Sequence, residues 1–206
     1  MKGLIIKDVF ALKSQGKLFL GLIIFYFIYA IALKNVTMLS MITLLCVMLP
    51  ITSMAYDERS KWDKYALSMP VSRKTIVLSK YLFSILLDIV GVIVVAVTST
   101  MIVSFSNEMK IIEVLLMSVL FGAICILFVS VMLPILFKFG VEKARFLMLI
   151  IVLIPVLFGA FTPKLGIAAP SEQTFKILVC LSPVVLVAIL FISIKISIYI
   201  YAKKEF

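Results

Sequence analysis

Histidine is absent from this chain, and its three cysteines do not form a paired motif. Because histidine is the commonest general base and metal ligand, its absence argues against most hydrolytic and metal-dependent sites. Cys46, Cys125 and Cys180 each lie alone within an apolar stretch. Such isolated cysteines are typical of small packing residues, not of disulfides or metal ligands.

The chain also lacks the motifs of nucleotide-binding proteins and of common hydrolases. Gly16-Lys17 is the only Gly-Lys pair; it lacks the earlier glycine of a phosphate-binding loop, and leucine follows it. Neither a Gly-x-Ser-x-Gly elbow nor a His-Glu-x-x-His site occurs. We therefore predict a non-enzymatic chain that binds no cofactor or metal of its own.

Charged residues are scarce, at 15% of the 206 residues against 64% hydrophobic ones, and the mean hydropathy is +1.27. Several windows exceed about 18 residues without a charge, which is the length that a helix needs to cross a bilayer. The sequence predicts an integral membrane protein. The net charge of +10 does not indicate nucleic-acid binding in this chain. The cations flank the apolar runs, where they set the orientation of membrane helices.

The apolar runs predict an all-α membrane protein with six transmembrane helices. Their expected bounds are about 18–33, 36–56, 81–106, 114–137, 146–161 and 177–199. Residues 1–16 are expected to form an amphipathic interfacial helix, with Ile5, Val9 and Leu12 on its apolar face. Two prolines, a glycine and three charges in residues 162–176 end the fifth helix, and this fairly apolar stretch is expected to lie on the membrane or dip into it. A cleaved signal peptide ending near Ala30-Ile31-Ala32 is the alternative for the first span.

The distribution of lysine and arginine predicts the orientation. Of the twenty such residues, fifteen fall on the side of the two termini and four on the other side. This asymmetry places both termini and the connector 57–80 in the cytoplasm, since cytoplasmic loops carry the excess of cations.

The connector 57–80 carries nine of the thirty charged residues and the only tryptophan. It is too polar to lie in lipid. Asp57 and Lys61 are spaced as an i,i+4 pair that supports a surface helix. Trp62 and Tyr65 lie near the same face, where aromatic groups suit either a protein contact or the lipid headgroup boundary.

Pro70 divides this connector. Ser72 after it is placed to cap a new helix that leads into the third span. Arg73 and Lys74 then fall in the first helical turn, where the helix dipole disfavours cations. An anionic lipid or an acidic partner would offset that cost.

Asp88 is the one clear carboxylate inside a predicted span. A buried acid in a span is a functional candidate by default. We favour a structural pairing with a lysine or with a hydroxyl such as that of Ser84. The alternative is that it faces a water-filled cavity.

The string Ala-Tyr-Asp-Glu-Arg-Ser-Lys-Trp-Asp-Lys-Tyr-Ala-Leu-Ser-Met-Pro-Val-Ser-Arg-Lys at 55–74 resembles the first cytoplasmic loop of type-2 ABC exporter permeases. These small bacterial six-span subunits include the exporters of phenol-soluble modulins and of bacitracin-type peptides. The resemblance implies that residues 57–67 form a coupling helix seated on an ATPase, and that residues 162–176 form a short extracellular helical segment. The contact residues of the coupling helix would be Asp57, Glu58, Arg59, Lys61, Trp62, Asp63, Tyr65 and Leu67, with Pro70, Ser72, Arg73 and Lys74 at the start of the third span.

The resemblance also implies the partners. Two ATPase subunits, which carry the ATP and Mg²⁺, would serve this permease together with a second copy of it or a paralogous permease in the bacterial cell membrane. The cargo would be an amphipathic peptide or another hydrophobic molecule leaving the cell. Two other classes stay open: a secondary transporter without an ATPase, and a membrane scaffold or immunity protein that binds a partner through 57–80.

Overall fold

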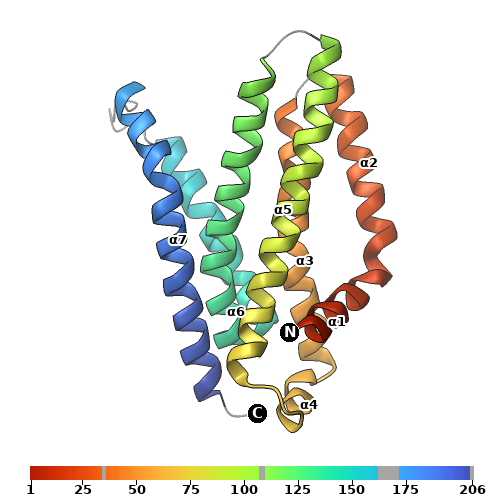
Figure 1. Cartoon of the computed structure of the whole chain (residues 1–206), viewed down its shortest axis with the longest axis vertical. Coiled ribbons are helices and arrows are strands. Elements are labelled where there is room, and N and C mark those ends of the chain that lie inside the picture. Colours follow the sequence, from red (N-terminus) through yellow and green to blue (C-terminus); the bar gives the residue numbers. More distant parts are fainter. Residues whose placement is uncertain (34–35, 107–109, 162–171, 205–206) are drawn as a thin grey trace.

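The computed structural model describes residues 1–33, 36–106, 110–161 and 172–204, and every regular element in these ranges is helical (Figure 1). In chain order the elements are α1 (Lys2–Leu12), η1 (Lys13–Gln15), α2 (Gly16–Leu33), η2 (Val36–Leu39), α3 (Ser40–Arg59), α4 (Trp62–Ser68), α5 (Arg73–Ser106), α6 (Ile111–Phe161) and α7 (Glu172–Lys203). The long helices run along one axis, and the short α4 lies at the end of the bundle where both termini are found.

Four helices of the described ranges are long and apolar enough to cross a membrane: α3, α5, α6 and α7. The number becomes five if α1 and α2, which are bent by 72° at their junction, count as one span. The prediction of a multi-pass all-α membrane protein is thus confirmed. The prediction of six spans is not confirmed: the expected span 18–33 lies in α2, which is long enough only together with α1, and the expected spans 114–137 and 146–161 form the two parts of α6.

Gly140 divides α6 into two helical segments. Its backbone has φ 76° and ψ 172°, which is not helical. Positive φ at this ψ is open almost only to glycine, because it lacks a Cβ atom. Figure 1 shows the consequence: α6 descends the bundle in green and turns back up in cyan beside α7.

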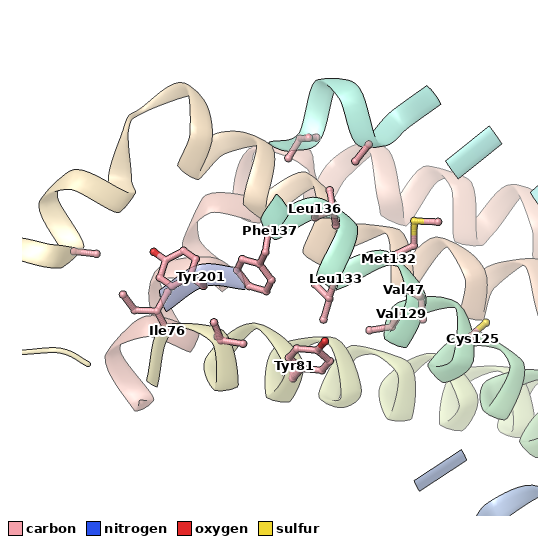
Figure 2. Packing of buried hydrophobic residues seen from close by; sticks show 14 residues of the cluster. Val47, Ile76, Tyr81, Cys125, Val129, Met132, Leu133, Leu136, Phe137 and Tyr201 are labelled. Carbon is pink, nitrogen blue, oxygen red and sulfur yellow. The ribbon is translucent and has the colours of Figure 1, made fainter. Parts of the chain in front are cut away.

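The core lies between α3, α5, α6 and α7 near this turn (Figure 2). Met132, Leu133 and Leu136 of α6 are fully buried there, and the rings of Phe137 and Tyr201 pack edge to face with centroids 5.4 Å apart. This close packing holds together the end of the bundle where α4 lies. Cys46 and Cys125 are both buried and free, as expected for packing residues.

A chain of hydroxyl groups crosses this core. The Tyr81 hydroxyl of α5 lies 2.5 Å from Ser193 Oγ and 2.7 Å from Ser197 Oγ of α7, and Ser193 in turn donates to the carbonyl of Ser130 in α6. These bonds satisfy polar groups that would otherwise be costly to bury, and they connect three helices.

The inward face of α1 holds Asp8 and Leu12, whereas Ile6, Val9 and Phe10 are exposed. Residues 2–12 are thus helical, and their expected position on the membrane surface stays a prediction. The expected segment 162–176 falls largely outside the described residues, and its last part, from Glu172 on, already belongs to α7.

Candidate functional site: the hairpin between α3 and α5

We call residues 57–74 the hairpin: they comprise the last turn of α3, the short helix α4 and the first residues of α5. The resemblance implied one helix over 57–67, but the structure divides it. Helix α3 ends at Arg59, and Lys61 adopts a left-handed conformation with φ 53°. The Ser60 hydroxyl also donates to the carbonyl of Asp57 at 3.2 Å, which helps to close the helix end. Leu67 lies in the short second helix, α4.

Asp57 points into the protein and not toward Lys61. Its carboxylate lies 2.5 Å from the Nζ of Lys7 in α1 and 2.6 Å from the Nζ of Lys80 in α5. The expected i,i+4 pair with Lys61 is not found among the described residues, because the left-handed turn at Lys61 ends the helix on which that spacing depends.

Asp8 completes a charge cluster with these three residues. Its Oδ1 lies 2.8 Å from Lys80 Nζ and 3.1 Å from Lys7 Nζ, and it accepts a hydrogen bond from Ser53 Oγ at 2.9 Å. Asp8 is 0% exposed. Two acids and two lysines balance, which buried charges require. The cluster joins α1, α3 and α5, and sequence reasoning missed it because its bonded pairs are up to 72 residues apart.

Glu58 holds the turn inside α6. Its Oε2 accepts a hydrogen bond from the backbone N–H of Val141 at 2.7 Å. A Cβ atom on Gly140 would lie only 2.6 Å from Glu58 Oε1. The carboxylate therefore caps the second segment of α6, where a helix start offers free N–H groups and favours negative charge. A cavity of about 270 Å³ opens beside it, lined by Ala55, Glu58, Arg59, Val141, Glu142 and Arg145.

Replacing Glu58 by alanine is expected to destabilise the turn by about 1–2 kcal/mol, the usual cost of a lost N-terminal cap. The measurement is amide hydrogen exchange at Val141, which should become faster. Glu58→Gln keeps an oxygen acceptor and should therefore destabilise the turn less than Glu58→Ala does. The control is Glu142→Ala, which removes an exposed acid at the same turn. Equal exchange in all three variants and the parent chain would show that the cap does not hold this turn.

The hairpin is also tied to the end of α7. Tyr201 of α7 donates its hydroxyl to Asp63 Oδ1 at 2.9 Å. Arg73 donates to the carbonyls of Ala202 at 2.6 Å and of Lys204 at 3.2 Å. For Arg73, the expected dipole cost of a cation in the first turn of α5 is thus offset by the carbonyl end of α7.

Ser72 caps α5 as expected. Its Oγ accepts a hydrogen bond from the backbone N–H of Thr75 at 3.2 Å and lies 2.8 Å from the Thr75 hydroxyl. Lys74 is exposed, and so is Pro70 in the extended link before the cap. The hairpin therefore enters α5 through a fixed turn.

Trp62 lies in a groove next to α1. The Nζ of Lys7 is 4.5 Å from the centroid of the indole ring, a cation–π arrangement. A cavity of about 390 Å³ adjoins them, and Met1, Leu4 and Pro70 are among the residues of its wall. Trp62 thus contacts its own chain, whereas Tyr65, one turn further along α4, is 63% exposed.

Asp88 lies apart from the hairpin, inside α5. It is 2% exposed, and its Oδ1 has no hydrogen-bond partner in the described part of the chain. The expected bond with Ser84 is not formed, because the Ser84 hydroxyl donates to the carbonyl of Lys80 at 2.8 Å. A Cβ atom on Gly122 of α6 would lie 2.4 Å from Val92 Cγ2, so glycine lets α6 approach α5 closely at the level of Asp88, whose Oδ2 would be 3.5 Å from that atom.

Comparison with known proteins assigns the family. The model of the family described as "ABC-2 family transporter protein" matches residues 3–202. The chain belongs to this family. Comparisons with curated proteins and with solved structures gave no match.

The match of this ABC-2 family protein covers nearly the whole chain and includes all four helices that are long enough to span a membrane. An ABC-2 family membrane domain is the transport component of an ABC transporter and works with an ABC ATPase. The family assignment therefore favours the permease class over a secondary transporter and over a scaffold.

Proposed function

We propose that this chain is the permease subunit of an ATP-driven exporter in the bacterial cell membrane, with both termini and the hairpin in the cytoplasm. A separate ATPase, present in two copies, docks on the hairpin and supplies the energy. A second copy of the chain, or a paralogous permease, completes the pathway. The cargo is an amphipathic peptide or another hydrophobic molecule.

One observation carries this proposal: the inner side of the hairpin is bonded to four other helices. Asp57 connects it to α1 and α5, Glu58 connects it to the turn of α6, and Asp63 connects it to α7. A displacement of the hairpin therefore reaches α1, α5 and α6 through Asp57 and Glu58 in the last turn of α3, and it reaches α7 through Asp63 of α4. Packed helices with discrete arrangements transmit such a shift over the length of a bundle.

The absence of a phosphate-binding loop in the sequence supports this division of labour, because another subunit must then hold the nucleotide. ATP binding by the paired ATPases moves the two hairpins, and the helices bonded to them tilt. The route between the two permease chains then opens outward for the cargo.

The test is purification of the full chain from its native membrane, followed by reconstitution of the captured complex into vesicles. An ABC ATPase, recognised by its phosphate-binding loop, should be captured with the chain. Transport of a fluorescently labelled amphipathic helical peptide should then require ATP. Equal transport by this polypeptide alone in ATP-free vesicles would contradict the proposal, and so would labelling of Lys61 from outside the cell.

A further inference from the structure

Asp88 lies where three long helices meet. On one side, a Cβ atom on Gly122 of α6 would lie 2.4 Å from Val92 Cγ2 and 3.5 Å from Asp88 Oδ2. One turn further along α5, a Cβ atom on Gly91 would lie 3.1 Å from the Cα atom of Thr43 in α3. The two glycines therefore let α3 and α6 pack closely against α5 at the level of Asp88, which is 2% exposed.

Asp88 has no cation beside it in the described ranges. None of the ion pairs found there includes Asp88, and its Oδ1 atom has no hydrogen-bond partner. Lys80 lies eight residues earlier in α5, about 12 Å along the helix, and its amino group belongs to the charge cluster. The titratable groups near Asp88 on α3 and α6 are the thiols of Cys46 and Cys125, which supply no positive charge. An ionised carboxylate would therefore be a buried charge without compensation, which is costly inside a membrane.

Two other polar groups lie at the same level. The Thr43 hydroxyl is fully buried and has no hydrogen-bond partner among the residues that the structure describes. Pro50 has no N–H group to donate to the carbonyl of Cys46, whose Cβ atom would lie 3.2 Å from a Cβ atom on Gly91. A carboxylate only accepts hydrogen bonds, whereas a protonated carboxyl group also donates one to a hydroxyl or carbonyl oxygen. These surroundings therefore favour the neutral acid over the carboxylate.

We propose that Asp88 is a proton-binding site inside the membrane. The proton stays on the carboxyl group while α6 packs against α5 at Gly122, because neither bulk water nor a cation reaches the group there. When α6 moves away from α5, water enters, the carboxyl O–H bond breaks, and the proton passes to water and leaves Asp88 ionised. Low pH then favours the packed arrangement of α5 and α6, and high pH favours the separated one. The site does not depend on the proposed function, since a chain that captured no ATPase would still bind this proton.

The experiment is infrared spectroscopy of the full chain in phosphatidylcholine nanodiscs, because a protonated carboxyl group has a C=O stretching band of its own. At neutral pH the parent chain should show this band, and Asp88→Asn, which keeps the shape but cannot titrate, should lack it. The control is Asp63→Asn, which removes an aspartate of the hairpin and should leave the band unchanged. Absence of the band from the parent chain, or an equal band in Asp88→Asn, would overturn the inference.

A carbon isotope label identifies the band even if Asp88→Asn does not fold. With ¹³C in the side-chain carboxyl groups of aspartate, the band of the parent chain should shift. In Asp88→Glu the same label should no longer shift it, because the protonated group then belongs to an unlabelled glutamate. A band that does not respond to the label in the parent chain comes from another residue type, and the site is then wrongly assigned.

Gly122→Leu tests whether the packing of α6 holds the proton. The larger side chain does not fit against Val92 and should separate α5 from α6 at this level. The pH at which half of the band is lost should therefore fall by at least about one unit, because water then stabilises the carboxylate. Gly122→Ala should give a smaller shift in the same direction. The matched control is Gly21→Leu, since a Cβ atom on Gly21 meets nothing within 4 Å; equal titration in Gly122→Leu and Gly21→Leu would show that contact with α6 does not hold the proton.

Discussion

Replacing Lys80 by methionine is expected to destabilise the folded chain by about 3–5 kcal/mol, because removing one partner of a buried ion pair leaves an uncompensated charge. Lys80 lies within 2.8 Å of carboxylate oxygens of both Asp8 and Asp57, and its side chain is almost fully buried. Two acids would then share the single cation of Lys7. The free energy of unfolding can be measured by titrating the purified chain with a denaturing detergent.

The matched control is the double variant Asp8→Asn/Lys80→Met. It removes one charge of each sign and leaves Lys7 and Asp57 as a pair 2.5 Å apart. Because the remaining charges balance, most of the stability should return. A double variant as unstable as Lys80→Met would show that charge balance is not what this cluster provides.

The second large effect is expected at Gly140. Alanine there would need a backbone conformation that costs about 1–3 kcal/mol outside glycine. Its Cβ atom would also lie 2.6 Å from Glu58 Oε1 and would push the carboxylate away from the Val141 N–H group. Gly140→Ala should therefore lower the unfolding free energy by more than the strain alone and should speed amide exchange at Val141.

Gly21→Ala is the control for this change. Gly21 lies within α2, and a Cβ atom there would meet nothing within 4 Å. Alanine is a better helix former than glycine by roughly 0.5–1 kcal/mol, so this variant should be as stable as the parent chain or slightly more stable. If Gly140→Ala and Gly21→Ala have the same unfolding free energy and the same amide exchange at Val141, the turn of α6 does not depend on Gly140.

Local signals in the sequence predicted the features that depend on neighbouring residues. Long uncharged runs predicted membrane helices, and the polar stretch between two of them predicted an exposed connector. Ser72 after Pro70 predicted a helix start, and the structure has α5 begin at Arg73 with Ser72 as its cap. Each of these three predictions depends only on residues that are close together in the sequence.

The inward contacts of the hairpin were not predictable in that way. Asp57 has an attractive local partner in Lys61, yet it bonds Lys7 and Lys80, which lie far away in sequence. The lone acid of the N-terminal segment, Asp8, was a signal that could have been followed, since a single carboxylate among lysines is suited to a buried pair. Gly140 was another, because a glycine between two apolar runs marks a reversal.

The positions of Met1 and Lys204 next to the hairpin have a practical consequence for every capture assay. Met1 borders the groove that contains Trp62, and the backbone of Lys204 is held by Arg73. A purification tag fused directly to either end would therefore crowd the surface on which a partner is expected to sit. A flexible glycine–serine spacer of about 20 residues, which reaches roughly 25 Å on average, keeps the tag clear.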